Sequence, residues 1–425
     1  MKILVVGLNF QPELIGIGRY SGELAAYLAA QGHAVHVITT PPYYPHWKIQ
    51  AGYDGRRYQK ETWQEVEIHR CPLWVPQRPT GLTRLIHLAS FAFSSLPALV
   101  AHLRWKPEVV LSVAPSFMNA PFALAFARLS GAVAWLHMQD FELDAAANLD
   151  MLPGRRYIYP LAHAFEQLIL THFDHVSTIS ENMRSRSIEK GVEPERAVLL
   201  PNWVDTRRIS PLQHPNSLRA ELNLSPETFV ALYHGNMGFK QGLESLLDIA
   251  GFVQDKTEIL FVICGEGPAK QGLVEAASSH PNVRFLDLQS EERLNDLVNL
   301  ADVHLLPQRA DAADLVMPSK LLTMLASGRP VIAEAVQGTQ ISKVLDKVGM
   351  LVQPGDAAAF AQALVKLFED PPERLRLGNL SRVYACQHFD KELILSHINQ
   401  SLTLDDWSWP TVPFEFGPQP HYPAH

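Results

Sequence analysis

Short apolar runs alternate with amphipathic segments along most of this 425-residue chain. The apolar runs have the length and flanking turn residues of buried strands, and the segments between them have helical periodicity. The predicted strands cover residues 3–6, 35–39, 109–113, 132–136, 175–179, 229–233, 259–264, 303–307 and 331–333. Repeated strand–loop–helix units predict α/β domains on parallel sheets, whose ligands bind outside the carboxyl ends of the strands.

The alternating pattern stops near the middle of the chain. A Pro-Asn-Trp-Val-Asp segment at residues 201–205 precedes a polar, proline-containing stretch over residues 207–226, which we interpret as a linker. Because the chain is too long for one typical core, we predict two doubly wound domains, residues 1–205 and 206–370. Residues 371–404 are predicted as helices, with a return to the N-terminal domain as one option. The proline- and aromatic-rich residues 405–425 predict a disordered tail, or aromatic side chains docked on the body.

A glycine-rich turn between a predicted strand and helix is the clearest candidate for chemistry. Residues 235–242 read Gly-Asn-Met-Gly-Phe-Lys-Gln-Gly. Glycine lets the backbone approach a ligand closely, and the start of a helix offers free N–H groups and partial positive charge. Lys240 adds a full positive charge. The turn therefore suits a diphosphate, with Gly235, Asn236 and Lys240 as candidate contacts.

Two further loops fall at the same end of the predicted sheet. Gly-Glu-Gly-Pro at residues 265–268 follows one strand, and Pro-Ser-Lys at residues 318–320 opens a helix after another. Each loop alone is typical of an ordinary turn between strand and helix. Three unusual loops at one sheet end favour a common ligand.

Composition narrows the classes of partner. A net charge of −8 and a pI of about 6.1 disfavour nucleic acid as a general partner. Cys71, Cys264 and Cys386 are odd in number and far apart, which argues against a disulfide framework and favours a reducing compartment. The sequence has no Asp-x-Asp motif and no compact group of histidines and cysteines, so we expect no bound metal and no cofactor. No signal peptide is recognisable, and we expect the chain to stay on the cytoplasmic side.

Residues 68–107 differ in composition from the rest of the chain. They hold no Asp or Glu, although the chain has 44 of these residues. Their apolar centre, residues 85–103, approaches the length of about 20 residues that crosses a bilayer. Pro97, the serines and the histidines within it favour a basic-flanked helix lying on an anionic membrane surface. A buried helix of the first domain is the equally weighted alternative.

Together these motifs resemble the GT-B glycosyltransferases of family GT4. The resemblance covers residues 1–370 and is carried by the opening MKILVVGLNFQPE, by residues 201–205 and 235–242, and by Pro-Ser-Lys at 318–320. It extends to the branch of the family that builds capsule, O-antigen and colanic acid polysaccharides. The resemblance implies two doubly wound Rossmann-like domains facing across a cleft. The N-terminal domain would take the acceptor and the C-terminal domain the nucleotide sugar.

The resemblance also implies roles for residues around the diphosphate. Gly16 and Gly18 match the N-terminal glycine loop of the family, although a flexible loop needing glycine is the alternative. Lys240 matches the lysine that neutralises the departing diphosphate, where a preorganised cation stabilises developing charge. Asn236 stands where the family has an arginine. We infer that Lys320 restores this charge, with a solvated helix lysine as the alternative.

Further matched positions concern the nucleotide, the sugar and the acceptor. Gly265, Glu266 and Gly267 match the loop that approaches the nucleotide, where Glu266 is either an acceptor for ribose or base or a plain surface residue. His137 matches a histidine near the donor sugar, where it holds a hydroxyl, handles a proton or is structural. Asp140 begins an acidic loop, and its carboxylate is our candidate for orienting or deprotonating an acceptor hydroxyl. Glu142 and Asp144 are the other acidic residues of this loop.

The chain departs from the two glutamates that family GT4 usually separates by seven residues. Alignment on Pro318 and Ser319, which we take as donor contacts, puts Thr323 in the second position. Thr323 could bond a ribose hydroxyl but brings no negative charge. Asp314, or as second choice Asp311, is the candidate for contact with the donor sugar.

We therefore expect a retaining hexosyltransferase that uses a nucleotide-diphosphate sugar, with GDP-fucose as the suggested donor, and a lipid-linked oligosaccharide acceptor. We expect it to be peripheral on the inner face of the cytoplasmic membrane, held through residues 68–107. A nucleotide-sugar 2-epimerase of the same fold and a catalytically impaired nucleotide-sugar-binding protein are the alternatives. Assays for interconversion without an acceptor, and for binding without transfer, distinguish them.

Overall fold

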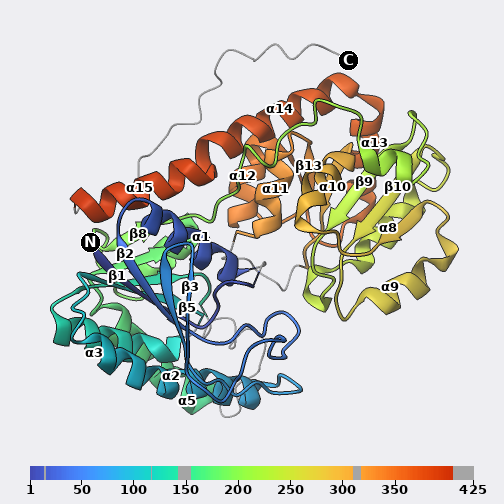
Figure 1. Ribbon diagram of the computed structural model, residues 1–425. Coiled ribbons are helices and arrows are strands. Elements are labelled where there is room, and N and C mark those ends of the chain that lie inside the picture. The colour runs from blue at the N-terminus through green and yellow to red at the C-terminus, as the bar shows by residue number, and fades with distance from the viewer. Residues whose placement is uncertain (14–15, 116, 142–154, 310–316, 405–425) are drawn as a thin grey trace. The chain divides into compact units, whose positions relative to one another are not determined.

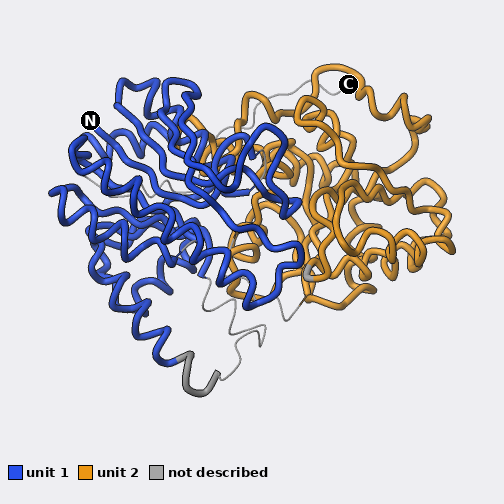
Figure 2. The backbone as a smooth tube through the Cα atoms, turned by 60° about the horizontal axis from the view of Figure 1, so that its bottom comes forward, with its two compact units in different colours: residues 1–202, 395–409 blue, residues 203–394, 410–425 orange. Residues whose placement is uncertain are grey.

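The computed structural model describes residues 1–13, 16–115, 117–141, 155–309 and 317–404. The chain divides into two compact units (Figure 2). Among the described residues, unit 1 comprises residues 1–202 with 395–404, and unit 2 comprises residues 203–394. The predicted tail, residues 405–425, lies outside the described residues.

Unit 1 is built on an eight-stranded sheet, with the strand order β3-β4-β2-β1-β5-β6-β7-β8. Its strands are β1 (Lys2–Gly7), β2 (Ala34–Thr39), β3 (Gln59–Trp63), β4 (Val66–Arg70), β5 (Val109–Ala114), β6 (Val133–Met138), β7 (His175–Thr178) and β8 (Ala197–Leu199). Neighbouring strands are parallel, except that β3 pairs antiparallel with β4. The central strands are apolar along nearly their whole length because both faces of a parallel sheet are covered.

Helices cover both faces of this sheet, with α1 on one side and α2 and α3 on the other (Figure 1). The helices are α1 (Ile17–Ala30), α2 (Gly81–His102), α3 (Ala120–Ser130), α5 (Arg155–Leu170) and α6 (Glu181–Glu189), with a 3-10 turn at Phe117–Asn119. Capping side chains fix two helix starts, since the hydroxyl of Thr80 accepts from Thr83 N and that of Ser180 accepts from Met183 N.

Unit 2 carries a six-stranded, fully parallel sheet, in the order β11-β10-β9-β12-β13-β14. Its strands are β9 (Phe229–His234), β10 (Ile259–Cys264), β11 (Val283–Leu286), β12 (Val303–Leu306), β13 (Val331–Glu334) and β14 (Met350–Val352). The core on one face of this sheet joins the buried side chains of β9 and β10 to those of α8 and α13. Strands β9 and β10 therefore hold the loops that follow them in fixed positions.

The helices of unit 2 connect these strands and continue into two C-terminal helices. They are α7 (Ser217–Glu221), α8 (Glu244–Phe252), α9 (Lys270–Ala276), α10 (Leu294–Leu300), α11 (Ser319–Ala326), α12 (Gln340–Val348), α13 (Ala357–Glu369), α14 (Pro371–His388) and α15 (Lys391–Leu404). Short 3-10 turns lie at Phe239–Gln241, Ala277–Ser279 and Glu291–Arg293. Pro371 begins α14 because proline fits the first turn, and Asp370 caps the helix by accepting from Glu373 N. Residues of α15 from Leu395 onward belong to unit 1.

Each predicted strand is present within two residues of its expected bounds. The hairpin β3–β4 was not predicted, because β3 is a polar edge strand with exposed and half-buried side chains only. The predicted linker, residues 207–226, contains the short helix α7. Helix α1 begins at Ile17, so Gly18 lies in its first turn and not in the preceding loop as predicted.

Helix α2 accounts for most of the acid-free stretch at residues 68–107. It buries one stripe, namely His87, Phe91, Ala92, Ser95, Ala98, Leu99 and His102. Its outer face exposes large apolar side chains, namely Leu82, Leu85, Ile86, Phe93 and Val100. Among the described residues it is the one helix that is long and apolar enough to cross a membrane by length and composition. Its inner stripe belongs to the core of unit 1, so the buried-helix alternative explains one face and leaves the outer face unexplained.

Candidate active site

Two glycine turns lie against each other at the carboxyl ends of β9 and β10 in unit 2. Gly265 has a φ of +148°, and a Cβ on it would stand 1.9 Å from the carbonyl oxygen of Gly235. Gly267 has a φ of +156°, and its Cβ would stand 2.4 Å from the oxygen of Met237. Both positions therefore require glycine, for backbone conformation and for close approach of the two loops.

Backbone hydrogen bonds fix this pair of turns. Gly235 N donates to the oxygen of Cys264 at 3.0 Å, and Met237 N donates to that of Glu266 at 2.8 Å. Ala269 N, just before α9, donates back to the oxygen of Met237 at 2.9 Å. The glycine turn after β9 is thus held in one shape by the neighbouring loop, which is the preorganisation that an anion-binding backbone site needs.

Lys320, in the first turn of α11, points its ammonium group at this turn. Its Nζ donates to Tyr233 Oη at 3.0 Å and lies 4.5 Å from the centre of the Tyr233 ring. The same Nζ is 3.9 Å from the position that a Cβ of Gly235 would take. Tyr233 Oη in turn donates to the oxygen of Asn236 at 2.7 Å. Burial lowers the pKa of Lys320 to about 8, so the group is mostly charged at neutral pH.

Thr323 and His234 form a second hydrogen-bonded layer beside Lys320. Thr323 Oγ1 donates to the oxygen of Lys320 at 2.8 Å and lies 3.1 Å from His234 Nε2. Burial and the charge of Lys320 lower the pKa of His234 to about 3, so this imidazole is neutral and donates its Nε2 proton to Thr323. The one hydroxyl proton of Thr323 is already used, so a ribose hydroxyl could only donate to this oxygen.

A buried carboxylate that the sequence did not point to joins two loops of unit 2 and the start of helix α8. Glu334 ends β13 and accepts hydrogen bonds from Gly355 N at 3.0 Å, Gln308 N at 3.2 Å and Ser245 Oγ at 3.3 Å. Burial raises the pKa of its carboxyl group. Its position directly after the apolar run of a predicted strand is the signal that could have identified it. We assign it to positioning these loops.

The remaining predicted donor contacts of unit 2 differ in how they lie. Asn236 is exposed on the turn, Pro318 precedes α11, and Ser319 is its exposed first residue. Glu266 is exposed and accepts from Lys270 Nζ at 2.6 Å, so it is engaged in an ion pair. The backbone of Lys240 lies in the 3-10 turn after Gly238. The side chain of Lys240, and both Asp311 and Asp314, lie outside the described residues.

In unit 1, His137 lies at the end of β6 within a closed polar network. Its Nδ1 is 2.9 Å from Ser177 Oγ, which also accepts from Trp135 Nε1 at 2.7 Å. Its Nε2 is 2.8 Å from the side-chain amide of Gln139, and that amide pairs with Asn202 through two hydrogen bonds of 2.9 and 3.0 Å. Burial lowers the pKa of His137 to about 4. The imidazole is therefore neutral, and both of its nitrogens have partners within the protein.

The other predicted positions of unit 1 lie beside this network or after β1. Asp140 follows Gln139 directly and is half-buried. Glu142 and Asp144 lie outside the described residues. Gly16 is exposed, with a φ of +65°, and precedes α1. Unit 1 thus brings His137 and Asp140 to one strand end and places the two glycines after another.

Gly18 is buried because a carboxylate takes the space of its missing side chain. A Cβ on Gly18 would stand 2.9 Å from that of Glu13. Glu13 is buried and accepts from Asn9 Nδ2 at 2.8 Å and from the backbone N–H groups of Tyr43 and Tyr44 at 2.9 Å each. Burial raises its pKa. Glu13 was missed as a positioning residue, because nothing in its local sequence reveals the loop after β2 that it binds.

Comparisons with known proteins agree with this architecture. Residues 16–203 match the family model of the glycosyl transferase 4-like domain, and residues 228–370 match that of the glycosyl transferases group 1. Over 404 residues the chain is 39% identical to an Escherichia coli (strain K12) protein named colanic acid biosynthesis glycosyl transferase WcaI. That match covers 93% of this chain and 98% of the other.

Two solved structures illustrate the similarity of fold. Sucrose-phosphate synthase from Thermosynechococcus elongatus superimposes with a TM-score of 0.74 at 19% identity, over 95% of this chain and 98% of that one. HepE from Anabaena, in complex with UDP-glucose, gives a TM-score of 0.68 at 14% identity, over 95% of this chain and 100% of that one. At these identities the similarity concerns the fold.

Proposed function

The chain belongs to the GT4 glycosyltransferases, whose fold is GT-B, and we propose that it transfers a hexose from a nucleotide-diphosphate sugar to a lipid-linked oligosaccharide. The product would be an intermediate of a surface polysaccharide of the colanic acid type. The name of the 39%-identical relative supports this pathway class, and HepE, bound to UDP-glucose, supports the donor class.

The observation that carries the proposal is the placement of Lys320 against the bare glycine turn after β9. A nucleotide diphosphate needs a cation and backbone N–H groups in one place, since charge accumulates on it as the sugar departs. Lys320 Nζ lies 3.9 Å from where a Cβ of Gly235 would be, so the ammonium group stands close to this backbone. Lys240, in the same turn, is our candidate for the second positive charge.

The proposed chemistry retains the configuration of the donor sugar. The bond from the anomeric carbon to the diphosphate oxygen breaks, and the acceptor oxygen bonds to the same face of that carbon. The acceptor proton passes to an oxygen of the leaving diphosphate, so no separate base is required. Asp140 would orient the acceptor hydroxyl, and Asp314 would contact the sugar. His137 would position Gln139 and Asn202, because it is neutral and both of its nitrogens are engaged.

Donor identity is tested directly with membrane lipid extracts. Purified protein is incubated with radiolabelled GDP-fucose, other GDP-sugars and UDP-sugars, and label in the lipid fraction is counted. We expect transfer from GDP-fucose, with retention of configuration at the new linkage. If label is transferred from another nucleotide sugar and not from GDP-fucose, that sugar is the donor. Donor binding without transfer or hydrolysis would favour the impaired binding protein, and interconversion without acceptor would favour the epimerase.

We also propose that the outer face of α2 holds the enzyme on the inner leaflet of the cytoplasmic membrane. Phe93 is 66% exposed and Val100 is 63% exposed, although both are apolar. The exposed Arg78, Arg84 and Arg104 lie before, within and after the helix. Such a face suits an anionic lipid surface. In flotation with anionic liposomes, the wild type should float with the liposomes. A Phe93→Ser, Val100→Ser variant should stay in the soluble fraction. Phe252→Ser, which removes an exposed apolar residue of unit 2, is the control. A wild type that remains unbound would refute the docking proposal.

A further inference from the structure

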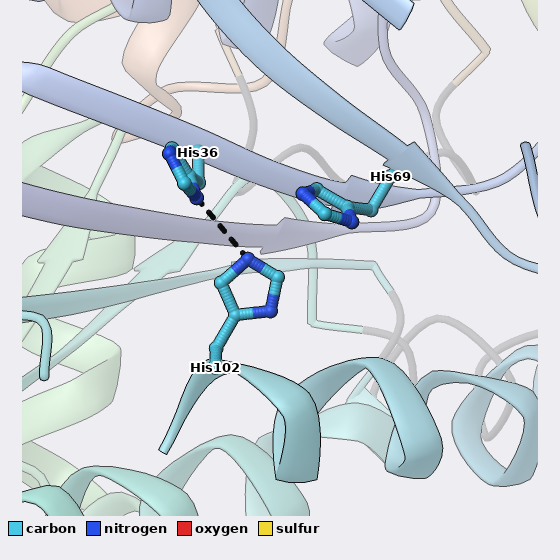
Figure 3. Close-up of side chains that lie close together, drawn as sticks. All are labelled: His36, His69 and His102. Carbon is cyan, nitrogen blue, oxygen red and sulfur yellow. Dashed lines mark hydrogen bonds between the residues drawn. The ribbon is translucent and has the colours of Figure 1, made fainter. Parts of the chain in front are cut away.

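Three histidines that are far apart in the sequence meet in unit 1 (Figure 3). His36 lies on β2, His69 lies on β4, and His102 is the last residue of α2. One potential ligand atom from each lies within 4.8 Å of the other two. We propose that these imidazoles bind one divalent zinc ion, at a site distinct from the proposed donor site of unit 2.

The register of the sheet explains why these residues converge. His36 is paired with Glu67 across the β2–β4 ladder, and His69 follows Glu67 by two residues. Side chains two residues apart on a strand share a face, so His36, Glu67 and His69 all stand on the same face of the sheet. Figure 3 shows His102 projecting from the end of α2 toward the two strand histidines.

The distances suit a small ion between the rings. His36 Nδ1 and His102 Nε2 are 3.2 Å apart. Two imidazole nitrogens bound at about 2.0–2.1 Å to a tetrahedral zinc ion are separated by about 3.3 Å. The ring centres of His69 and His102 are 4.5 Å apart, and those of His36 and His69 are 5.8 Å apart. The three potential ligand atoms lie within 4.8 Å of one another, so the third nitrogen would move toward the first two on binding.

Neighbouring groups already orient the rings as metal ligands require. His102 Nδ1 donates to the oxygen of Ala98 at 2.7 Å, which leaves the lone pair on Nε2 directed at His36. Glu67 Oε1 is 2.6 Å from His69 Nε2, and its Oε2 is 3.8 Å from His36 Nε2. A carboxylate or carbonyl bonded to the far nitrogen fixes the tautomer of an imidazole and raises its basicity as a ligand.

The electrostatics of the cluster also favour a metal cation. Burial lowers the pKa of all three histidines, that of His36 to about 4, so each is neutral at pH 7 and keeps a free lone pair. The carboxylate of Glu67 supplies negative charge, and the exposed Lys60 opposes it, with its Nζ 3.9 Å from Glu67 Oε1. Imidazole ligands select zinc, copper or nickel over calcium or magnesium.

The bound zinc ion would have a structural role. It would join the end of α2 to β2 and β4, on the face of the sheet where Trp105 stacks on His36 with ring centres 3.8 Å apart. This site would hold in place the helix whose outer face we propose for membrane docking. Because it lies within unit 1 and contains none of the proposed donor contacts, zinc should raise thermal stability without being required for donor binding.

The test uses the full chain, stripped with a chelator and titrated with zinc chloride in a calorimeter. We expect one tightly bound ion per chain and a higher melting temperature. His36→Ala and His102→Ala should each abolish this binding, and Glu67→Gln should weaken it by about 10–100-fold. His214→Ala removes an exposed histidine of unit 2 and should bind as the wild type does.

Unchanged binding in both His36→Ala and His102→Ala, or no binding by the wild type, would overturn the proposal. Cobalt(II) gives a second readout that does not depend on the variants being folded. Cobalt bound to the stripped wild type should show the intense visible absorption of tetrahedral coordination. A weak, octahedral spectrum would equally overturn the proposed site.

Discussion

The two sheets display different chemistry at their carboxyl ends, although both units are doubly wound. In unit 2, two glycine turns leave backbone uncovered beside the ammonium group of Lys320. In unit 1, the histidine at the end of β6 is buried, neutral and bonded through both ring nitrogens. The first arrangement suits an anion that gains charge, and the second suits rigid positioning of neutral groups.

The loops at the two sheet ends are nevertheless fixed in the same way, by a buried glutamate. Glu13 in unit 1 and Glu334 in unit 2 are both buried, and each accepts two backbone N–H groups from neighbouring loops. Burial raises the pKa of both. The difference between the two sheet ends therefore resides in the groups they display and not in how their loops are held.

The largest expected effect concerns the packing of the two glycine turns. In Gly265→Ala the new Cβ would meet the oxygen of Gly235 at 1.9 Å, at a φ of +148°. Strain and overpacking together should destabilise unit 2 by about 4 kcal/mol and abolish donor binding. Gly272→Ala, in α9 with nothing within 4 Å of the new Cβ, should leave stability unchanged or slightly higher. Chemical denaturation measures both, and equal stabilities for the two variants would show that the turns are not packed as described.

Removal of the Lys320 ammonium group should have the next largest effect. Lys320→Ala should lower the transfer rate by about 10²–10³-fold, because a preorganised charge near the leaving diphosphate is lost. Lys366→Ala, which removes an exposed lysine from α13, should transfer at the wild-type rate. Radiolabelled transfer into lipid extract measures both. If Lys320→Ala transfers sugar as fast as the Lys366→Ala control, Lys320 does not contribute to the donor site.

His137 should matter more for stability than for proton transfer. His137→Ala removes one hydrogen bond each from Ser177 and Gln139, which keep their bonds to Trp135 and Asn202, and it should cost about 1–3 kcal/mol in this buried network. His172→Ala, at an exposed position of the same unit, should change stability by less than about 0.5 kcal/mol. Thermal and urea unfolding compare the two variants. Full stability of His137→Ala combined with complete loss of transfer would instead assign His137 a catalytic role.

The smallest predicted effect is a pH dependence of nucleotide binding. The pKa of Lys320 is lowered by burial to about 8, so the side chain is charged below this pH and neutral above it. Affinity for a nucleoside diphosphate should therefore fall as pH rises through 8, by up to about tenfold per pH unit. Lys320→Arg keeps its charge and should show a flat profile between pH 7 and 9. Calorimetric titrations across this range measure both proteins, and identical profiles would contradict the assignment.

The sequence predicted the sheets better than it predicted what surrounds them. The strand at residues 259–264 was predicted with its observed bounds, because a continuous apolar run between turn residues is typical of a buried parallel strand. The strand β3, with the sequence QKETW, escaped prediction because it is a polar edge strand. Gly18, which was expected in a loop, lies in the first turn of α1 and packs on Glu13.

The candidate site was predictable where its residues form local motifs. The glycine turns and Lys320 belong to short segments at the carboxyl ends of predicted strands, so topology alone placed them together. The contacts of Glu13 depend on a loop distant in sequence, and those of Glu334 depend on two loops and the start of helix α8. His36 and His102 lie 66 residues apart and meet only through the β2–β4 register and the end of α2. Such convergence leaves no local pattern to recognise.

The central claim is that the glycine turn after β9 and Lys320 together hold the donor diphosphate. A crystal structure of the full chain with GDP or UDP tests it most directly. We predict diphosphate oxygens within hydrogen-bond distance of Lys320 Nζ and of backbone N–H groups of residues 235–242 other than those of Gly235 and Met237, which bond Cys264 and Glu266. A bound nucleotide whose diphosphate lies away from this turn, with Lys320 still bonded only to Tyr233, would contradict the account.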